Sequence, residues 1–228
     1  MDRFFCPQLA AETELSLPAD EARHVRQVLR KTAGEVVQLF DGRGNWCEAE
    51  LIRVDKKAVV AATGSLHSDP PVSGGLTIAA AVPKADRFKW MIEKLTELGV
   101  ASFVPLSTHR GVVAPGAAKL ERMHSTVIAA CKQSGRNRLM TIDPMSSLEG
   151  LQERATDRRL IADVPQAADG AEVAATAGGS TLVAIGPEGG WTPGERDAAI
   201  ASGFRSVSFG RHVLRTETAA IAAAARLV

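Results

Sequence analysis

Short apolar runs alternate with amphipathic segments over the last two thirds of the chain. Runs that are apolar throughout are typical of strands buried on both faces of a sheet, and their alternation with helices favours mainly parallel pairing. We therefore predict an α/β domain in this part of the chain. Its expected strands are 76–82, 100–106, 160–162, 182–185 and 207–209, and its expected helices are 86–98, 117–134, 192–203 and 216–228.

The first part of the chain carries a different pattern, with one amphipathic helix at 20–30 and strand-like runs at 36–40, 46–54 and 58–63. Short strands separated by turn residues predict a small, compact β-barrel. Prolines and glycines then interrupt every periodic pattern at 68–75. We place the domain boundary there, which gives a first domain of residues 1–72 and a second of residues 73–228.

Two glycine-bearing loops follow the last two expected strands. The first reads Gly186-Pro187-Glu188-Gly189-Gly190-Trp191, and the second begins Gly210-Arg211-His212-Val213-Leu214. Glycine lets bare backbone groups approach a ligand closely, and ligands of α/β proteins bind at the carboxyl ends of the strands. We expect both loops to line one pocket; the alternative is that a glycine loop only turns the chain. Between them, Thr192-Pro193-Gly194-Glu195 is a capping box that predicts the start of a helix.

Five motifs together resemble a known family. They are Arg3-Phe4-Phe5, Lys94-Leu95-Thr96-Glu97-Leu98-Gly99-Val100, Gln133-Ser134-Gly135-Arg136, Ile185-Gly186-Pro187-Glu188-Gly189-Gly190 and Leu214-Arg215-Thr216-Glu217-Thr218-Ala219. With these motifs the chain resembles the bacterial 16S ribosomal RNA uridine N3-methyltransferases, a family of the SPOUT (knotted) methyltransferases. The resemblance implies a PUA-like RNA-binding β-barrel followed by a SPOUT α/β domain with a C-terminal trefoil knot. It also implies S-adenosyl-L-methionine as the methyl donor, and 16S ribosomal RNA or the small ribosomal subunit as the partner.

The resemblance also assigns roles around the expected pocket. Methylation of uridine N3 requires loss of the imide proton, so a cation near the uracil oxygens and a proton acceptor would both help. Arg215 is our candidate cation and Glu217 our candidate base, although Glu217 can instead serve only to cap the helix. The residues expected to contact S-adenosylmethionine are Gly186, Glu188, Gly189, Gly190, Phe209, Gly210, Val213, Leu214, Thr216 and Ala219.

Basic residues exceed acidic residues between positions 84 and 138, although the formal net charge of the whole chain is only +1. A local basic surface suits RNA phosphates, whereas solvent-exposed helix faces with paired charges are the alternative interpretation. A basic stripe on the first helix adds to this surface. The candidate RNA-binding residues are Arg3, Arg23, Arg26, Arg30, Lys84, Arg87, Arg110, Gln133, Arg136 and Arg138.

The composition and the missing motifs disfavour several other classes. With 228 residues and 45% hydrophobic content, the chain is an ordinary globular one, and we expect it in the cytoplasm because no signal peptide or membrane-spanning run is visible. Cys6, Cys47 and Cys131 should be reduced apolar fillers, and the five histidines show no metal-ligand spacing. No Walker loop, dinucleotide fingerprint or serine-hydrolase motif appears.

Three functions stay open at this point. They are methylation of uridine N3, ribose 2′-O-methylation as in related knotted enzymes, and RNA binding without catalysis in ribosome assembly. The expected helix 216–228 is apolar on nearly every side, and only Glu217 and Arg226 are charged. We therefore predict that a second subunit covers it in a homodimer, as the resemblance also implies; a monomer that buries the helix internally is the alternative.

Overall fold

The computed structural model describes residues 1–70, 74–111, 116–164 and 179–228, and its contacts divide the chain into two compact units. Unit 1 comprises Met1–Pro71 together with Cys131–Leu139, and unit 2 comprises Val72–Ala130 together with Met140–Val228. The predicted boundary between residues 72 and 73 lies outside the described residues. No local pattern indicates that residues 131–139 join the first unit.

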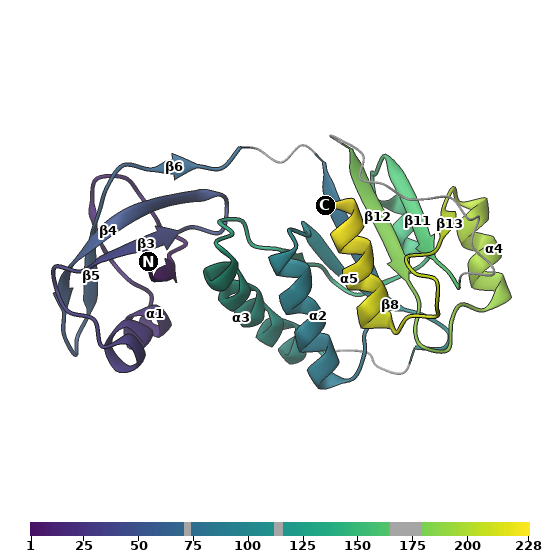
Figure 1. Cartoon of the computed structure of the whole chain (residues 1–228), viewed down its shortest axis with the longest axis horizontal. Helices are drawn as coiled ribbons and strands as arrows, with labels where there is room; N and C mark the ends of the chain where they lie inside the picture. Colours follow the sequence, from purple (N-terminus) through teal and green to yellow (C-terminus); the bar gives the residue numbers. More distant parts are fainter. Residues whose placement is uncertain (71–73, 112–115, 165–178) are drawn as a thin grey trace. The chain divides into compact units, whose positions relative to one another are not determined.

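Unit 1 is a β domain with a short helical segment (Figure 1). In its described residues the strand order is β1 (Arg3–Phe5), β3 (Val36–Phe40), β4 (Asn45–Val54), β5 (Val59–Thr63) and β2 (Glu14–Ser16), and β6 (His67–Ser68) pairs with β4. The order ends at β1 and β2, and no pair between these two strands is found among the described residues. The small β domain is therefore present as predicted, while its closure into a barrel stays a prediction.

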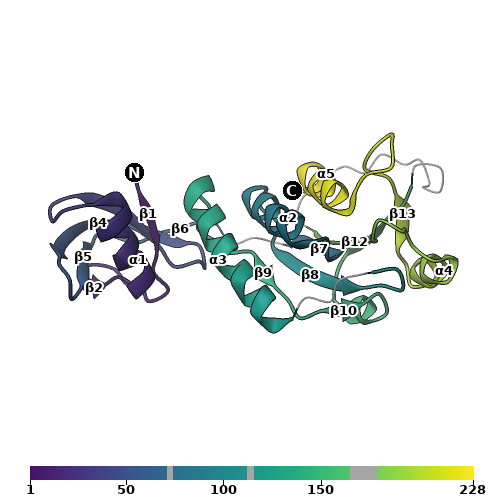
Figure 2. The ribbon, with the colours of Figure 1, turned by 90° about the horizontal axis from the view of Figure 1, so that it is seen from below.

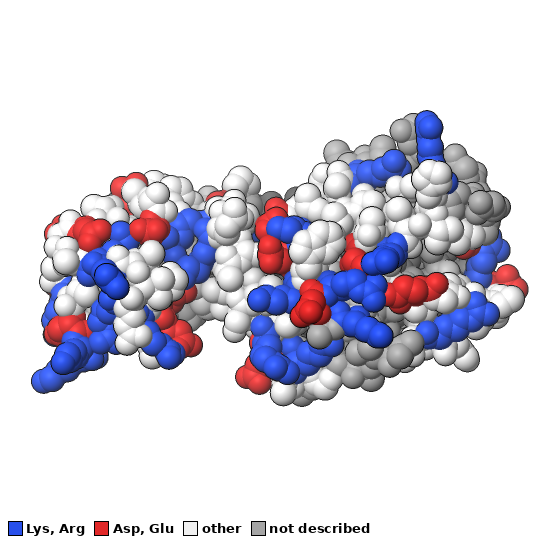
Figure 3. All heavy atoms as spheres, turned by 60° about the horizontal axis from the view of Figure 1, so that its bottom comes forward, with Lys and Arg blue, Asp and Glu red and all other residues white. Residues whose placement is uncertain are grey.

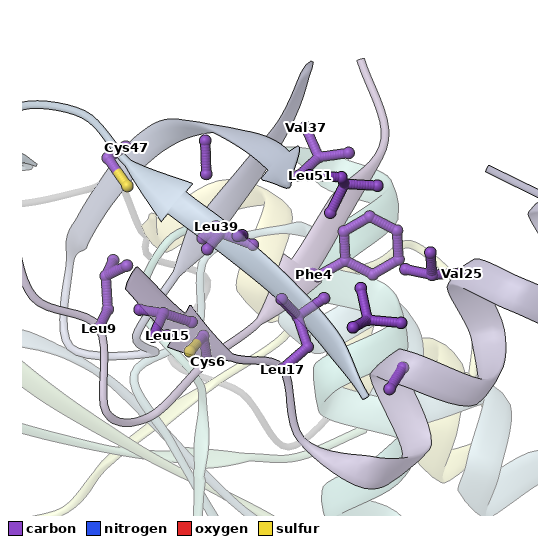
Figure 4. Packing of buried hydrophobic residues seen from close by; sticks show 14 residues of the cluster. Phe4, Cys6, Leu9, Leu15, Leu17, Val25, Val37, Leu39, Cys47 and Leu51 are labelled. Atoms are coloured by element: carbon purple, nitrogen blue, oxygen red, sulfur yellow. The ribbon is translucent and has the colours of Figure 1, made fainter. Parts of the chain in front are cut away.

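The predicted helix 20–30 is present but changes type along its length. α1 (Ala19–Arg23) continues into the π-helical η1 (His24–Leu29), which ends at Arg30 in the left-handed conformation. Its inner face completes the core of unit 1 in Figure 4, where Val25 approaches Phe4 and Leu51. Cys6 and Cys47 are buried in the same core, and all three cysteines of the chain are free and buried, as predicted.

Unit 2 contains the predicted parallel sheet. Every strand pair found among its described residues is parallel, in the order β10 (Ser146–Ser147), β8 (Ser102–Ser107), β7 (Gly75–Ala81), β12 (Ser180–Ile185), β11 (Arg158–Ala162) and β13 (Arg205–Val207), with β9 (Thr141–Ile142) beside β8. The helical elements are α2 (Ala85–Glu97), α3 (Ala117–Ser134), η2 (Gly150–Glu153), α4 (Pro193–Ala201) and α5 (Thr216–Leu227).

The sheet of unit 2 is buried on both faces, which explains its uninterrupted apolar strands. Ala79 of β7, Val104 of β8 and Ala184 of β12 belong to one hydrophobic core cluster. Ala199 of α4 and Phe204, which follows this helix, pack in the same cluster. α5 packs on α2, β7 and β12, and Figures 1 and 2 both show α2 and α5 side by side. The strand expected at 207–209 lies two residues earlier, because β13 runs from Arg205 to Val207 and the following residues enter a loop.

Candidate functional site

Two loops of unit 2 leave the sheet at the carboxyl ends of β12 and β13, and β11 lies between these strands. We call residues 186–191 the first loop and residues 208–215 the second loop. Both loops line one pocket, as predicted, and we call it the loop pocket. Nine of the ten residues expected to contact a cofactor lie on its walls, namely Gly186, Glu188, Gly190, Phe209, Gly210, Val213, Leu214, Thr216 and Ala219.

The first loop is folded tightly against a tryptophan. The Gly190 N–H donates to the Pro187 carbonyl at 2.8 Å, and Gly190 adopts a φ of 70°, which favours glycine. A Cβ at Gly186 would lie 3.0 Å from the Trp191 ring, and the Trp191 indole N–H donates to the Ala162 carbonyl at 2.8 Å. Glycine at position 186 therefore lets the Trp191 ring pack directly against the backbone of the first loop, where that loop lines the pocket.

Gly189 is the tenth expected residue, and it is not among the pocket-lining residues. A Cβ there would lie 3.3 Å from Cδ of Arg110, whose guanidinium donates to the Gly189 carbonyl at 2.7 Å. Arg110, predicted to bind RNA, thus anchors the first loop from outside the pocket. A side chain added at position 189 would test that anchor and not the pocket.

The second loop leads directly into α5, whose first turn touches the first loop. The Thr216 hydroxyl donates to the Gly186 carbonyl at 2.9 Å, and Thr216 is buried. A Cβ at Gly210 would lie 3.2 Å from the Leu214 side chain, so this glycine permits the loop to close on itself. The two loops are therefore held together by backbone approach and one buried hydroxyl.

Several pocket residues were missed by the sequence analysis. Asp163 lines the pocket after β11, where its carboxylate accepts from Arg196 Nε at 2.6 Å and from the Ser206 hydroxyl at 3.3 Å. Its position directly after an apolar strand was the available signal. The other missed residues on the walls are Ala162, Val164, Ile185, Pro187, Trp191, Ser208 and His212.

A second pocket shares Pro187 and Glu188 with the loop pocket. We call it the basic pocket because Lys84, Arg87 and Arg215 line it. Its remaining wall is formed by Ala81, Val82, Pro83 and Gly111. Arg215, the candidate cation, therefore lies beside the loop pocket and not within it.

Glu217, the candidate base, lines neither of these pockets. It is buried in the first turn of α5, and its Oε1 lies 3.3 Å from Arg87 Nη1. The same Arg87 nitrogen lies 3.1 Å from Glu188 Oε1. Arg87 consequently joins a buried carboxylate to an exposed one, and we no longer consider Arg87 a direct RNA contact.

The capping box at the start of α4 is present as predicted. The Glu195 N–H donates to the Thr192 hydroxyl oxygen at 3.2 Å, and the Glu195 carboxylate accepts from the Thr192 N–H at 2.8 Å. Glu195 also accepts from the His109 N–H at 2.9 Å. Burial opposes ionisation of Glu195, yet these hydrogen bonds outweigh it and lower the pKa of the carboxyl group.

Some of the predicted RNA-binding residues instead hold unit 1 together. Arg3 donates to the Cys131 carbonyl at 3.0 Å and to Asn137, and burial lowers the pKa of its guanidinium. Arg138 donates to the carbonyls of Arg43 and Asp69. Because their donors serve these internal contacts, we withdraw Arg3 and Arg138 as RNA contacts.

The other predicted RNA-binding residues differ in exposure. Arg23, Arg30, Lys84 and Gln133 are exposed, whereas Arg26 and Arg136 are half-buried, and burial lowers the pKa of Arg136. Arg23 forms an ion pair with Asp20 one helical turn away, and Arg26 donates to the Asp55 carbonyl at 3.1 Å. Figure 3 shows Lys and Arg interleaved with Asp and Glu on the face of each unit that it presents.

Two further searches cover the described part of the chain only. They find no group of three or more His, Cys, Asp or Glu side chains able to hold a metal ion. They also find no helix with the length and apolar character needed to cross a membrane.

Comparison with known proteins agrees with this arrangement. The RNA methyltransferase domain family matches residues 70–228, and the RNA methyltransferase PUA domain family matches residues 17–63. The ribosomal RNA small subunit methyltransferase E of Synechocystis is 32% identical, with 97% of this chain and 75% of that protein covered. Its namesake in Bacillus subtilis is 29% identical, with 96% and 93% covered.

Solved structures give the same result. The ribosomal RNA small subunit methyltransferase E of Neisseria gonorrhoeae, bound to S-adenosyl methionine, matches with a TM-score of 0.89 and 32% identity over 99% of this chain and 95% of its own. A Legionella pneumophila methyltransferase in complex with the cofactor matches with a TM-score of 0.87 and 31% identity, covering 97% and 94%. The chain therefore belongs to the RNA methyltransferase family that includes the ribosomal RNA small subunit methyltransferases E.

Proposed function

We propose that this protein transfers a methyl group from S-adenosylmethionine to N3 of a uridine in 16S ribosomal RNA. Methylation of ribosomal RNA with this donor follows from the family and from relatives that are named for it or solved with it. The choice of uridine N3 comes from the resemblance of the motifs. The observation that carries the proposal is the loop pocket, where two glycine-bearing loops meet beside a basic pocket.

The residues of the loop pocket fit S-adenosylmethionine. Gly186 and Gly210 line the pocket without side chains of their own, and an added Cβ would lie only 3.0 Å from Trp191 or 3.2 Å from Leu214. Phe209 and Ala219 add apolar surface, which suits an adenine ring and a thioether chain. When bound, the sulfonium supplies an activated methyl group, so the chain has to bind, orient and deprotonate the acceptor.

The basic pocket favours a base nitrogen over a ribose hydroxyl as the acceptor. A uracil that loses its N3 proton carries negative charge on its oxygens, and Arg215 and Lys84 would stabilise that charge. Ribose 2′-O-methylation is the second candidate, since related enzymes share the fold. The complete set of pocket residues argues against a protein that only binds RNA.

We extend the proposal to the organisation of the protein. Residues 1–72 would serve as a PUA-like RNA-binding domain and residues 73–228 as the catalytic SPOUT domain, acting in the cytoplasm. The trefoil knot is supported by the chain path, because β13 ends the strand order while the following α5 packs on β7 and β12. A homodimer is supported by the small side chains of α5 that remain partly exposed, such as Ala222 and Ala225.

Nucleoside analysis tests the proposal most directly. The protein is incubated with labelled S-adenosylmethionine and either free 16S ribosomal RNA or small subunits, and the digested RNA is separated. Label in N3-methyluridine is the expected result, whereas label on ribose would support the second candidate. RNA binding without any transfer would contradict both enzymatic functions.

A glycine variant links the reaction to the loop pocket. Gly186→Val places a side chain against Trp191, so we expect cofactor affinity measured by calorimetry to fall by about tenfold or more, which corresponds to about 1.4 kcal/mol. Gly194→Val is the matched control, because nothing lies within 4 Å of an added Cβ at that position. Equal cofactor affinity of both variants and the unmodified protein would refute the pocket assignment.

A further inference from the structure

Lys84 and Arg215 give the basic pocket an anion-binding character. They are the N-cap residues of α2 and α5, and neither side chain caps its helix. Among the described residues, neither side chain forms a hydrogen bond or ion pair, although both line the pocket. The N-terminal ends of the two helices add partial positive charge to these two cations, so a ligand with delocalised negative charge is favoured.

Glu188 is the acidic residue at this site. It lines both pockets, so it lies where the two pockets meet, and its side chain is 48% exposed. Arg87 Nη1 holds one of its oxygens at 3.1 Å. A carboxylate in this place can reach a base in the basic pocket while the methyl donor occupies the loop pocket.

Glu217 has the opposite environment. Its side chain is only 6% exposed, and its Oε2 is buried without a hydrogen-bond partner among the described residues. Its Oε1 lies 3.3 Å from the Arg87 nitrogen that also contacts Glu188. Glu217 therefore acts as a positioning residue, because its negative charge fixes Arg87 and Arg87 fixes Glu188.

We propose that the basic pocket holds the target uracil between Lys84 and Arg215, and that Glu188 is the catalytic residue that accepts the N3 proton. This inference rests on the proposed function. The N3–H bond breaks and the proton moves to the Glu188 carboxylate, while the electron pair on N3 forms the bond to the methyl carbon. The C–S bond breaks with its electron pair staying on sulfur, which leaves a neutral thioether. The exposed Glu188 then releases its proton to water.

The role of Glu188 is tested by single-turnover kinetics over a range of pH. Glu188→Gln should lower the rate by about a hundredfold or more, whereas affinities for cofactor and RNA, measured separately by calorimetry, should change far less than the rate. From neutral to mildly alkaline pH, the rate of the unmodified protein should change little, because a carboxylate supplies the base. The rate of the variant should rise by about tenfold per pH unit over the same range, because it depends on uridine that ionises in water. Formate should restore part of the activity of Glu188→Ala.

Glu121→Gln, an exposed substitution on α3, is the matched control for Glu188→Gln. An unchanged rate or an unchanged pH profile of Glu188→Gln, with N3-methyluridine still made by the unmodified protein, would overturn the inference. Failure of the unmodified protein to make N3-methyluridine would overturn the proposed function instead. The two failures are therefore distinguishable.

A binding measurement without methyl transfer tests the cations. RNA that carries 5-fluorouridine at the mapped target position is bound without cofactor, and the ¹⁹F resonance is followed against pH. The pKa of its N3–H should fall by about one unit or more on binding, because Lys84 and Arg215 stabilise the anion. Lys84→Ala should reverse part of this fall, and Lys89→Ala, elsewhere on α2, should not. The same ionisation pH in free and bound RNA would overturn the pocket assignment.

Discussion

Asp41 shows how one side chain organises a loop of unit 1. Its buried carboxylate accepts from the backbone N–H groups of Arg43 at 2.7 Å and Asn45 at 3.0 Å, and from the Asn45 side chain at 2.7 Å. Burial alone would raise the pKa of Asp41, but these hydrogen bonds outweigh it and lower the pKa. The folded state therefore binds this proton less readily than the unfolded state.

We predict a pH-dependent contribution of Asp41 to stability. It should be fully present above the ordinary pKa of aspartate, about 4, and lost as the pH falls through the lower pKa of the folded state. At neutral pH, Asp41→Ala should reduce the free energy of unfolding of unit 1 by about 1–3 kcal/mol, because it removes the shared acceptor of three partly buried donors. Urea unfolding at several pH values measures both effects, with Asp197→Ala as control, because Asp197 is exposed on α4. Parallel pH curves for Asp41→Ala and the unmodified protein would contradict this account.

The cysteines allow a second prediction at this scale. Burial raises the pKa of the Cys6 thiol to about 11. Because only the thiolate reacts, alkylation of Cys6 by iodoacetamide at mildly alkaline pH should be about a hundredfold slower in the native protein than in urea. Mass spectrometry of the modified peptides gives the rates. Rapid native labelling at Cys6 would show that the core of unit 1 opens readily.

The sequence analysis found the glycines whose role depends on the conformation of their own backbone. It missed side chains whose role depends on contacts with residues distant in the sequence. Gly186 and Gly210 were found because glycine in a loop after a strand is a local signal. The role of Trp191 depends on the Ala162 carbonyl, which lies next to it only because β11 pairs with β12. Glu188 was predicted as a cofactor contact only. The residues of the basic pocket are far apart in the sequence, so the sequence does not show that Glu188 also lines this pocket.

At the scale of elements, local signals placed the long helices well. The capping box predicted the start of α4, and α3 has its predicted bounds, 117–134. The three-residue strands β1 and β2 were missed, because such short segments carry no measurable periodicity. Long-range pairing with β3 and β5 makes them strands.

The contact between α5 and the first loop gives a prediction for these elements. Thr216→Val keeps the shape of the side chain but removes the hydroxyl that donates to the Gly186 carbonyl. We expect a loss of about 1–2 kcal/mol in the free energy of unfolding, together with weaker cofactor binding because the first loop is less fixed. Thr218→Val is the control, since Thr218 is exposed on the same helix. Equal cofactor affinity and stability of the two variants would show that this hydrogen bond does not hold the loop.

At the scale of the whole molecule, the discontinuous unit 1 could not be predicted. Residues 131–139 belong to it because Arg3 contacts Asn137 and Lys132 contacts Glu21 at 2.6 Å, across more than a hundred positions. The sequence analysis assigned Arg3 to RNA with the motif Arg3-Phe4-Phe5 and Arg138 with the basic run around Gly135, because an arginine that binds phosphate and an arginine that holds two segments together look the same in a sequence. The hydrogen-bond partners of the two guanidinium groups in the folded structure distinguish a structural arginine from one that binds RNA.

The homodimer prediction also changes once burial is known. Ala220, Ala223 and Ala224 are fully buried within unit 2, so α5 is covered internally along that face. On another side of α5, Ala222 is half-buried and Ala225 is exposed. On the neighbouring helix α2, 45% of the surface of Trp90 is exposed. Small residues on one helix and an exposed aromatic ring on its neighbour suit a second copy of the chain, so we place the expected interface on α2 and α5.

We predict that sedimentation equilibrium at micromolar concentration will give twice the chain mass of 24.1 kDa. Trp90→Glu and Ala225→Glu should each shift the protein towards the monomer, because an unpaired carboxylate is costly to bury in an apolar interface. Ala223→Glu is unsuitable, since it would disrupt the core of unit 2 itself. Ile200→Glu on α4, where Ile200 is 41% exposed, is the matched control and should remain dimeric. A single species at the chain mass for the unmodified protein would end the dimer proposal, and dissociation of the Ile200 variant alone would move the interface to α4.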